Sequence, residues 1–167
     1  MESDRMRKEI LDWLKQIGLA IVVTFFIVNF VGQFTIVQGN SMLPTLENND
    51  ILIIEKLTQR FGAYKQGDIV VVKIPEFLDG GKTYAIKRIA ATEGQRIAIH
   101  DGEVFVDGEK LQETYINGSE TQIAAGLHDD LTVPKDAVYI LGDNRLPGQS
   151  KDSRYFGPIS VKQITGR

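Results

Sequence analysis

The sequence contains no cysteine and only two histidines, His100 and His128, among its 167 residues. Without cysteine there are no disulfides, no thiolate catalysis and no cysteine-ligated zinc, and we expect no metal and no cofactor. The 19 Lys and Arg against 22 Asp and Glu give a net charge of −3. Nucleic acid is therefore not an expected partner, because phosphate binding needs a surplus of cations on one face. The length and the apolar content of 43% suit one domain with its own core.

One stretch lacks charge altogether, because no Lys, Arg, Asp or Glu occurs from residue 16 to residue 46. Within it, the 21 residues 17–37 are almost entirely apolar. A helix of that length spans roughly 30 Å, the thickness of a bilayer's hydrocarbon core, and exceeds the roughly 7–15 apolar residues of a cleaved signal. We therefore predict a transmembrane anchor over residues 17–37. The alternative, a buried core helix, would carry a polar stripe that is missing here.

The orientation of the anchor follows from its flanking cations. Four cations precede it: Arg5, Arg7, Lys8 and Lys15. The next cation along the chain is Lys56. This asymmetry predicts a single-pass protein of the cell membrane, with residues 1–16 as a cytoplasmic tail and residues 38–167 as an extracytoplasmic domain.

The segment after residue 37 has the pattern of an antiparallel β domain. Short runs rich in β-branched residues cover 51–55, 69–74, 83–90, 96–100, 103–107 and 137–141. Turn signals separate them, and Asp101-Gly102 between two such runs predicts a hairpin. Residues 111–133 are polar and irregular, which favours a long loop or a hairpin extension. The fold class is therefore mostly β, in antiparallel sheets that form one compact domain after a single helix.

Three clusters of residues could carry chemistry, and the first follows the anchor directly. Residues 39–46 read GNSMLPTL. Ser41 between a Gly-Asn pair and a Pro-Thr turn can be held with its hydroxyl exposed and its backbone N–H free to bind an oxyanion. The alternative interpretation is a surface turn that ends the helix.

The second cluster contains Lys87 within the run YAIKRI. Strand alternation places Lys87 on the same face as Ala85 and Ile89, which is an apolar setting for an ammonium group. Desolvation and the like charge of Arg88 both lower the lysine's pKa toward the range in which it can accept a proton. The alternative is a lysine that extends its charged end to solvent from a half-buried strand.

The third cluster spans residues 142–154, GDNRLPGQSKDSR. Alternating Asp, Asn, Ser and Arg in a loop with Gly and Pro can build a network of ion pairs and hydrogen bonds. The alternative is that this network only stabilises the loop. The same network would also hold Ser150 against Lys87.

These clusters, in this order after one anchor, resemble the type I signal peptidases, the membrane-bound serine proteases that remove signal peptides. The serine box matches G-N-S-M-x-P-T-L, the lysine box matches K-R-I, and the last box matches G-D-N-R…S-x-D-S-R. Residues 67–70, GDIV, match the segment between the first two boxes. The short stretch between Lys87 and Gly142 is similar to the compact form typical of Gram-positive bacteria.

The resemblance implies a role for each matched residue. Ser41 would be the nucleophile, Lys87 the general base, and Ser150 would orient the lysine amine. The other polar residues of the last box would hold the site together: Asp143, Asn144, Arg145, Asp152 and Arg154. The implied partners are membrane lipid and secreted preproteins, whose signal peptides carry small residues before the cleavage site and would bind extended along a strand edge.

The sequence departs from the family pattern at two places. Some members carry Ser or Thr two residues before the nucleophile, as a second oxyanion donor, and this chain has Gly39 there. The last box has four residues, 146–149, where the usual pattern has two. We expect Pro147-Gly148 to absorb the additional residues as a tight turn.

The substrate pockets and the alternative functions are further expectations. Ile36, Met42 and Leu43 lie near Ser41 in sequence and are candidates for the pockets. A Ser-His-Asp triad lacks a histidine, because His100 and His128 both sit in polar turns where we expect them to face solvent. Two other functions remain open: another Ser-Lys protease of the self-cleaving type, and a membrane-tethered β domain that binds a partner without catalysis.

Overall fold

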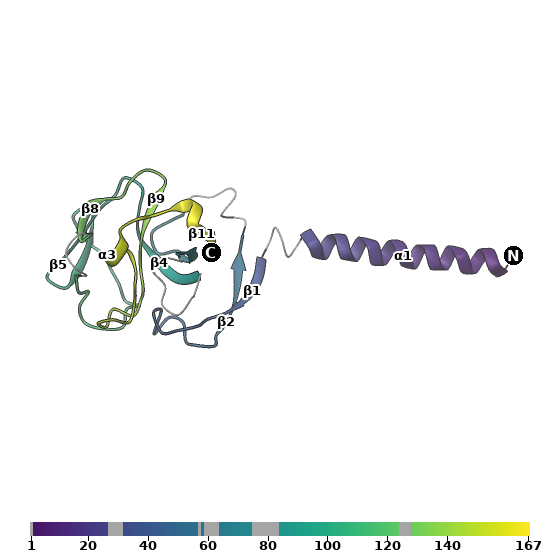
Figure 1. Cartoon of the computed structure of the whole chain (residues 1–167), viewed down its shortest axis with the longest axis horizontal. Coiled ribbons are helices and arrows are strands. Elements are labelled where there is room, and N and C mark those ends of the chain that lie inside the picture. Colours follow the sequence, from purple (N-terminus) through teal and green to yellow (C-terminus); the bar gives the residue numbers. More distant parts are fainter. Residues whose placement is uncertain (1, 27–31, 57, 59–63, 75–83, 124–127) are drawn as a thin grey trace.

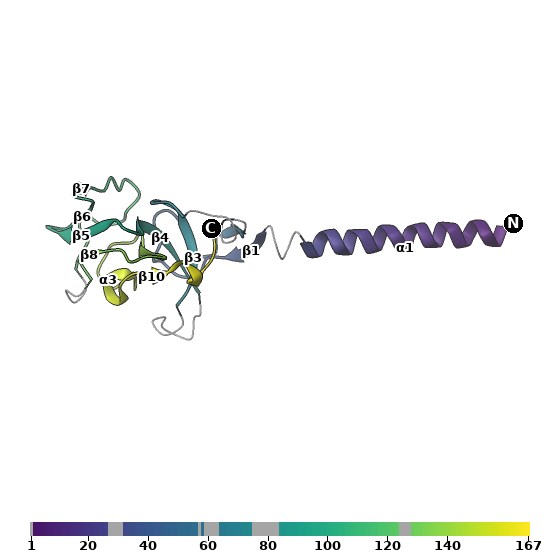
Figure 2. The same cartoon turned by 90° about the horizontal axis from the view of Figure 1, so that it is seen from above.

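The computed structural model describes residues 2–26, 32–56, 58, 64–74, 84–123 and 128–167. Helix α1 (Glu2–Phe26) lies apart from the β-rich remainder of the chain in both views (Figures 1 and 2). The predicted fold class is confirmed in its main feature, since the remainder consists mostly of antiparallel β-sheets. None of the helices in the described part of the chain combines the length and the apolar character that a membrane crossing requires.

The predicted helix over 17–37 is wrong for its last part. In the described residues α1 ends at Phe26, and Gly32–Ile36 forms strand β1. This strand pairs antiparallel with β2 (Ile51–Glu55), from Gly32 opposite Glu55 to Ile36 opposite Ile51. An apolar run alone does not distinguish helix from strand. Here the β-branched residues of β2 supply cross-strand partners, which favours the strand.

A five-stranded sheet carries most of the candidate site. Its strand order is β10-β9-β4-β3-β11, and neighbouring strands are antiparallel. The strands are β3 (Ile69–Lys73), β4 (Tyr84–Thr92), β9 (Ala137–Leu141), β10 (Ile159–Ser160) and β11 (Ile164–Gly166). Three of these were predicted within a few residues, whereas the two short strands β10 and β11 have too few residues for a recognisable alternation.

A four-stranded sheet has the order β7-β6-β5-β8. Its strands are β5 (Arg96–His100), β6 (Glu103–Val106), β7 (Glu109–Lys110) and β8 (Asp130–Thr132). The predicted hairpin is confirmed, because β5 and β6 are joined through Asp101 and Gly102, whose φ angles of 52° and 78° suit a tight turn. Strand β8 lies within the stretch predicted to be a loop, of which residues 124–127 lie outside the described part.

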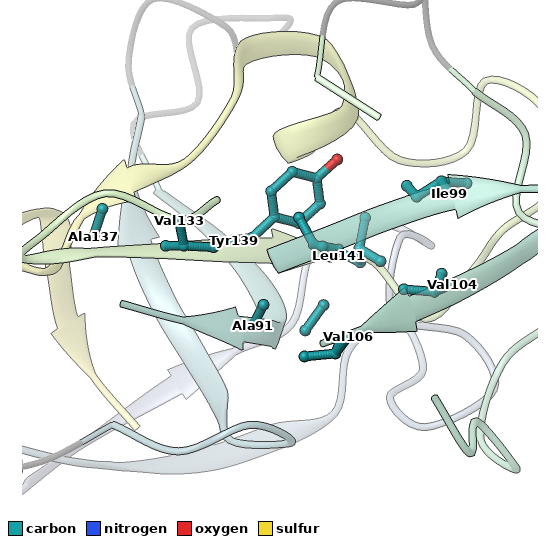
Figure 3. Packing of buried hydrophobic residues seen from close by; sticks show 10 residues of the cluster. Ala91, Ile99, Val104, Val106, Val133, Ala137, Tyr139 and Leu141 are labelled. Atoms are coloured by element: carbon teal, nitrogen blue, oxygen red, sulfur yellow. The ribbon is translucent and has the colours of Figure 1, made fainter. Parts of the chain in front are cut away.

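Strand β9 is buried on both of its faces and separates two hydrophobic cores. Tyr139 and Leu141 point into the core shared with the four-stranded sheet, where Figure 3 shows them beside side chains of β5 and β6. Val138 and Ile140 point into the second core, together with residues of β3, β10 and β11. The 142–154 segment therefore starts from a rigid strand. The short helix α3 (Ser153–Phe156) begins at the end of this segment, and the 3-10 helix η3 (Val161–Gln163) follows it; neither helix was expected.

Candidate active site

Ser41 and Lys87 come together although 46 residues separate them in the sequence. Lys87 lies in β4, opposite Val70 of β3, and Ser41 lies in the turn segment between β1 and β2. The Lys87 Nζ atom is 2.7 Å from the Ser41 Oγ atom and also donates to the Ile86 carbonyl at 3.1 Å. Only 3% of the Lys87 surface is exposed. The two candidate residues thus share one hydrogen bond at a site where the amine is shielded from water.

Asn144 holds the segment that carries Ser41. Its backbone N–H donates to the Ser41 carbonyl at 3.0 Å, and its side-chain Nδ2 donates to the Asn40 carbonyl at 2.9 Å. Asn144 is itself buried and follows β9 closely. The serine turn is therefore fixed to the rigid end of a core strand.

Asp143 connects the serine turn to the lysine strand. Its carboxylate accepts two hydrogen bonds from Arg88, from Nε at 2.9 Å and from Nη2 at 2.7 Å, and a third from the Thr45 hydroxyl. Burial lowers the pKa of Arg88, but the hydrogen bond and charge of Asp143 raise it by more, so the guanidinium stays charged. The ring of Tyr115 covers this guanidinium, with its centroid 3.9 Å from Cζ.

Asp152 is fully buried, and its carboxylate accepts hydrogen bonds from several donors. It accepts from Arg154 Nε and Nη2 at 2.8 Å each, from the Ser150 hydroxyl at 2.7 Å and from the Gly142 N–H at 3.0 Å. Burial alone raises the pKa of this carboxyl, but the Arg154 guanidinium and the two other donors together hold it below its ordinary value. Asp152 also caps helix α3. It therefore fixes the hydroxyl of Ser150 from one side.

Arg145 has a buried ion pair that the sequence did not indicate. Its guanidinium pairs with both carboxylate oxygens of Glu113, and it donates to the Thr121 hydroxyl and to the Gly142 carbonyl, the last at 2.8 Å. The side chain is 1% exposed. Arg145 thus ties the turn after β9 to the irregular segment between β7 and β8.

Gly142 is the point at which the serine turn and Ser150 meet. A Cβ atom built on Gly142 would lie 2.3 Å from the Ser150 Oγ and 2.5 Å from the Ser41 carbonyl oxygen. Both distances are far below a normal contact. Only glycine leaves room for the approach of the two segments, and we add Gly142 to the residues that shape the site.

A cleft of about 480 Å³ runs past Ser41 and Lys87. It is lined by residues 35–42, by residues 84–87, and by Val71, Gly148, Gln149 and Lys151. Of the candidate pocket residues, Ile36 and Met42 line this cleft, whereas Leu43 is not among the residues that do.

Comparison with known proteins identifies the family. The family of signal peptidases, peptidase S26, matches residues 10–167. The chain belongs to this family. It is 34% identical over 172 residues to signal peptidase I P of Bacillus subtilis subsp. natto, covering 99% of this chain and 90% of that protein. It is 35% identical over 162 residues to signal peptidase I of Leptolyngbya laminosa, covering 95% of this chain and 77% of that protein.

A solved structure of a signal peptidase I from Enterococcus faecalis V583 is 24% identical to this chain. The match covers 62% of this chain and 95% of the other, with a TM-score of 0.48. Membership of the S26 family indicates that the chain is a peptidase.

Both departures of this S26 peptidase from the pattern have a local structural explanation. Gly39 has a φ of 109°, a conformation that favours glycine, and its N–H donates to the Asn48 side chain at 2.9 Å. The 146–149 segment forms a tight turn, because the Gln149 N–H donates to the Leu146 carbonyl at 3.1 Å and Gly148 has a φ of 73°. The expected turn at Pro147-Gly148 is confirmed.

Neither histidine of the S26 peptidase lines the cleft. His100 is exposed, as expected, and stacks on Phe105 with 4.1 Å between the ring centroids. His128 is half-buried, so the expectation that it faces solvent is wrong. Its backbone carbonyl accepts a hydrogen bond of 2.8 Å from the hydroxyl of buried Tyr139. Because a buried hydroxyl needs an acceptor, this bond holds the backbone at His128 against the core.

Sequence reasoning missed several supporting residues: Thr45, Arg88, Glu113, Thr121 and Gly142. Thr45, Arg88 and Gly142 lie inside the matched boxes, so their position was a usable signal. Glu113 and Thr121 lie in the irregular polar stretch, where nothing marks a buried partner for a distant arginine. The predicted contact of Ser150 with the lysine amine stays a prediction, while Ser150 itself is buried and donates to Asp152.

Proposed function

We propose that this chain is a serine endopeptidase of the cell membrane that removes N-terminal signal peptides from exported preproteins. Ser41 is the nucleophile and Lys87 the general base of the proposed dyad. One observation carries the proposal: the 2.7 Å contact between Lys87 Nζ and Ser41 Oγ in a cleft of an S26 family member. It is the geometry that a general base needs toward the proton that it removes.

The proposed mechanism follows from the surroundings of the two groups. Burial keeps water away from the Lys87 amine, and the proposed mechanism uses this amine in its neutral form. The amine takes the Ser41 proton as Oγ attacks the scissile carbonyl, and the resulting ammonium returns a proton to the leaving amine. The acyl-enzyme that remains is an ester, and the same amine then activates water to hydrolyse it. The N–H of Ser41 is the proposed donor to the oxyanion.

The strand pairing supports an extended peptide as the substrate. Strand β1 pairs with β2 along one edge, and residues 84–88 of β4 pair with β3 along one edge. Strand β9 pairs only with residues 88–92 of β4. Within the described residues, the other edges of β1 and of residues 84–87 have no strand partner, and both segments line the cleft. A peptide can therefore add as a strand between them.

The apolar side chains of Ile36, Met42 and Ile86 line the same cleft. They support subsites for small apolar side chains, which is the character of the residues that precede a signal-peptide cleavage site.

The exposed apolar surface supports a location at the bilayer. The outer face of the β1–β2 hairpin carries three large apolar side chains that are 71–75% exposed: Phe34, Ile51 and Ile53. Apolar residues of α1, such as Leu19 and Phe25, are also largely exposed. Such contiguous apolar surface is rare on proteins surrounded by water. We propose that lipid covers it, with residues 1–16 in the cytoplasm and the cleft on the opposite side.

The proposal is tested by cleavage of a preprotein in detergent and in liposomes. Ser41→Ala and Lys87→Ala abolish cleavage, and Lys87→Arg is equally inactive because a guanidinium does not lose its proton at neutral pH. Ser119→Ala and Lys135→Ala, at exposed positions outside the cleft, serve as matched controls and stay active.

Cleavage is also expected to resist EDTA. Full activity of the Lys87→Ala protein refutes the dyad. No cleavage by the wild-type protein under any of these conditions favours the alternative of a binding domain without catalysis.

A further inference from the structure

A cavity of about 120 Å³ adjoins the cleft at Gly148, which lines both. Two arginines of the last box, Arg145 and Arg154, line this cavity together with Ser150, and all three are buried. Among the described residues that line it there is no aspartate or glutamate. The part of the cavity that the structure describes is therefore lined by two cationic side chains and by no carboxylate.

Arg145 leaves one N–H group without an acceptor among the described residues. A guanidinium has five N–H groups. In Arg145, Nε donates to the Gly142 carbonyl, Nη1 donates to Glu113 and to the Thr121 hydroxyl, and Nη2 donates to Glu113. The second N–H of Nη2 is the one that these bonds leave over.

Arg154 leaves two N–H groups in the same way. Its Nε and Nη2 each donate to Asp152 at 2.8 Å, and Nη1 donates to the Gln122 carbonyl at 3.3 Å. One further N–H on Nη1 and one on Nη2 have no acceptor in the described part of the chain. Charged donors form their strongest hydrogen bonds with ionised acceptors. The two guanidiniums beside the cavity thus keep donors available for an anion.

We propose that this cavity binds a small carboxylate through the remaining N–H groups of Arg145 and Arg154. A carboxylate is planar and has two acceptor oxygens, which match the planar arrangement of guanidinium donors. Tyr155 also lines the cavity, and its hydroxyl is a further donor to the ligand. The inference goes beyond the proposed function and does not depend on it, because the site lies outside the dyad and its occupancy requires no cleavage.

The affinity is expected to be modest. Glu113 and Asp152 already pair with the two arginines, so the ligand gains hydrogen bonds but meets little net positive charge. A dissociation constant of about 1–10 mM corresponds to a few such bonds. Because only the folded chain brings the two guanidiniums together, the ligand also stabilises the folded protein, and more so as its concentration rises.

The test is saturation-transfer NMR of formate with the full-length protein in detergent at pH 7. Formate is a carboxylate small enough for the cavity, and formamide is a neutral probe of nearly the same size. Leu146 lines the cavity and is 44% exposed, so its side chain can be exchanged at the rim. Leu146→Glu supplies a competing carboxylate, and Leu146→Gln is the matched control of the same size without the charge. Tyr155→Phe removes only the hydroxyl.

We expect a saturable formate signal for the wild-type protein and for Leu146→Gln, and none for Leu146→Glu or with formamide. Tyr155→Phe weakens formate binding about two- to tenfold, which is the effect of one lost hydrogen bond. Formate in place of chloride at equal ionic strength raises the thermal unfolding temperature of the wild-type protein and of Leu146→Gln, but not of Leu146→Glu.

The absence of a saturable formate signal from the wild-type protein overturns the inference. An equal formate affinity of the wild-type and Leu146→Glu proteins also overturns it, because the ligand would then bind elsewhere. Tyr155→Phe gives a decision that does not depend on how Leu146→Glu folds, and an unchanged affinity there contradicts the proposed site. None of these results bears on cleavage, so the proposed function stands or falls separately, by the tests of Ser41 and Lys87.

Discussion

Arg88 binds both oxygens of Asp143, and this pair joins the strand of Lys87 to the turn of Ser41. Arg88 follows Lys87 directly in β4, while Asp143 precedes Asn144, whose two hydrogen bonds hold residues 40 and 41. The Asp143 side chain is completely buried and that of Arg88 is 13% exposed. The position of Lys87 relative to Ser41 thus depends on the Arg88–Asp143 ion pair, in which neither Lys87 nor Ser41 takes part.

Removing one member of this pair should destabilise the protein strongly. Asp143→Ala leaves the Arg88 charge without its partner, and we expect it to lower the free energy of unfolding by about 3–5 kcal/mol. Asp130→Ala is the matched control, because Asp130 accepts a similar pair of hydrogen bonds from Arg96 and both side chains are more than half exposed. We expect this variant to lose much less stability, because water and salt screen an exposed pair. Equal losses in urea unfolding of the two variants would contradict this account.

A side chain at Gly142 should separate the residues of the site. Gly142→Ala places a methyl group against Ser150 and the Ser41 carbonyl, where no space exists. We expect kcat/KM to fall by about a hundredfold or more, because small displacements of reacting groups cost that much. Gly18→Ala, whose Cβ meets nothing within 4 Å, is the control and keeps its activity. An active Gly142→Ala protein would show that the close approach is not required.

Asp152 should make stability depend on pH in the acid range. Its pKa in the folded protein is lower than the ordinary value of 3.8, so its stabilising contribution is present above that value and is lost as the pH falls through the folded pKa. Asp152→Asn is therefore less stable than wild type at pH 7, and the difference narrows as the solution is acidified below about pH 4. Urea unfolding across this range measures it, with exposed Asp101→Asn as the control. A difference that stays constant over the whole range would refute the linkage.

The hairpin face should matter only where lipid is present. Ile51→Asp and Ile53→Asp put charges on side chains that are each 71% exposed and lie outside the cleft-lining set. We expect cleavage of a preprotein in liposomes to fall several-fold, because a charge resists burial in lipid, while cleavage of a short soluble peptide in detergent is unchanged. Ile123→Asp, at a position 48% exposed away from the hairpin, should leave both activities intact. Equal losses in both assays would point to misfolding instead of lipid contact.

The sequence predicted the strands well wherever a run rich in β-branched residues was long enough to detect. Residues 51–55, 96–100 and 137–141 form strands with the predicted bounds. The helix was predicted too long, because residues 32–36 continue the uncharged stretch, whereas their pairing with β2 makes them a strand.

The sequence predicted part of the candidate site. The three boxes identified side chains that come together in the structure, because the residues within each short motif are close in the sequence. The partners of Arg145 could not be predicted. Glu113 and Thr121 bind it from an irregular segment that has no periodic pattern. The close approach at Gly142 depends on three segments together, and no single segment indicates it.

The central claim is that the amine of Lys87 acts as a base on Ser41, and chemical replacement of that amine tests it most directly. The chain has no cysteine, so Lys87→Cys creates a single thiol that can be alkylated selectively. The unmodified variant should be inactive in preprotein cleavage. Alkylation with 2-bromoethylamine rebuilds an amine of nearly the same length and should restore cleavage at least tenfold above the unmodified variant, whereas iodoacetamide, which adds a neutral amide, should restore none. Full activity of the unmodified variant, or equal activity after both reagents, would contradict the account.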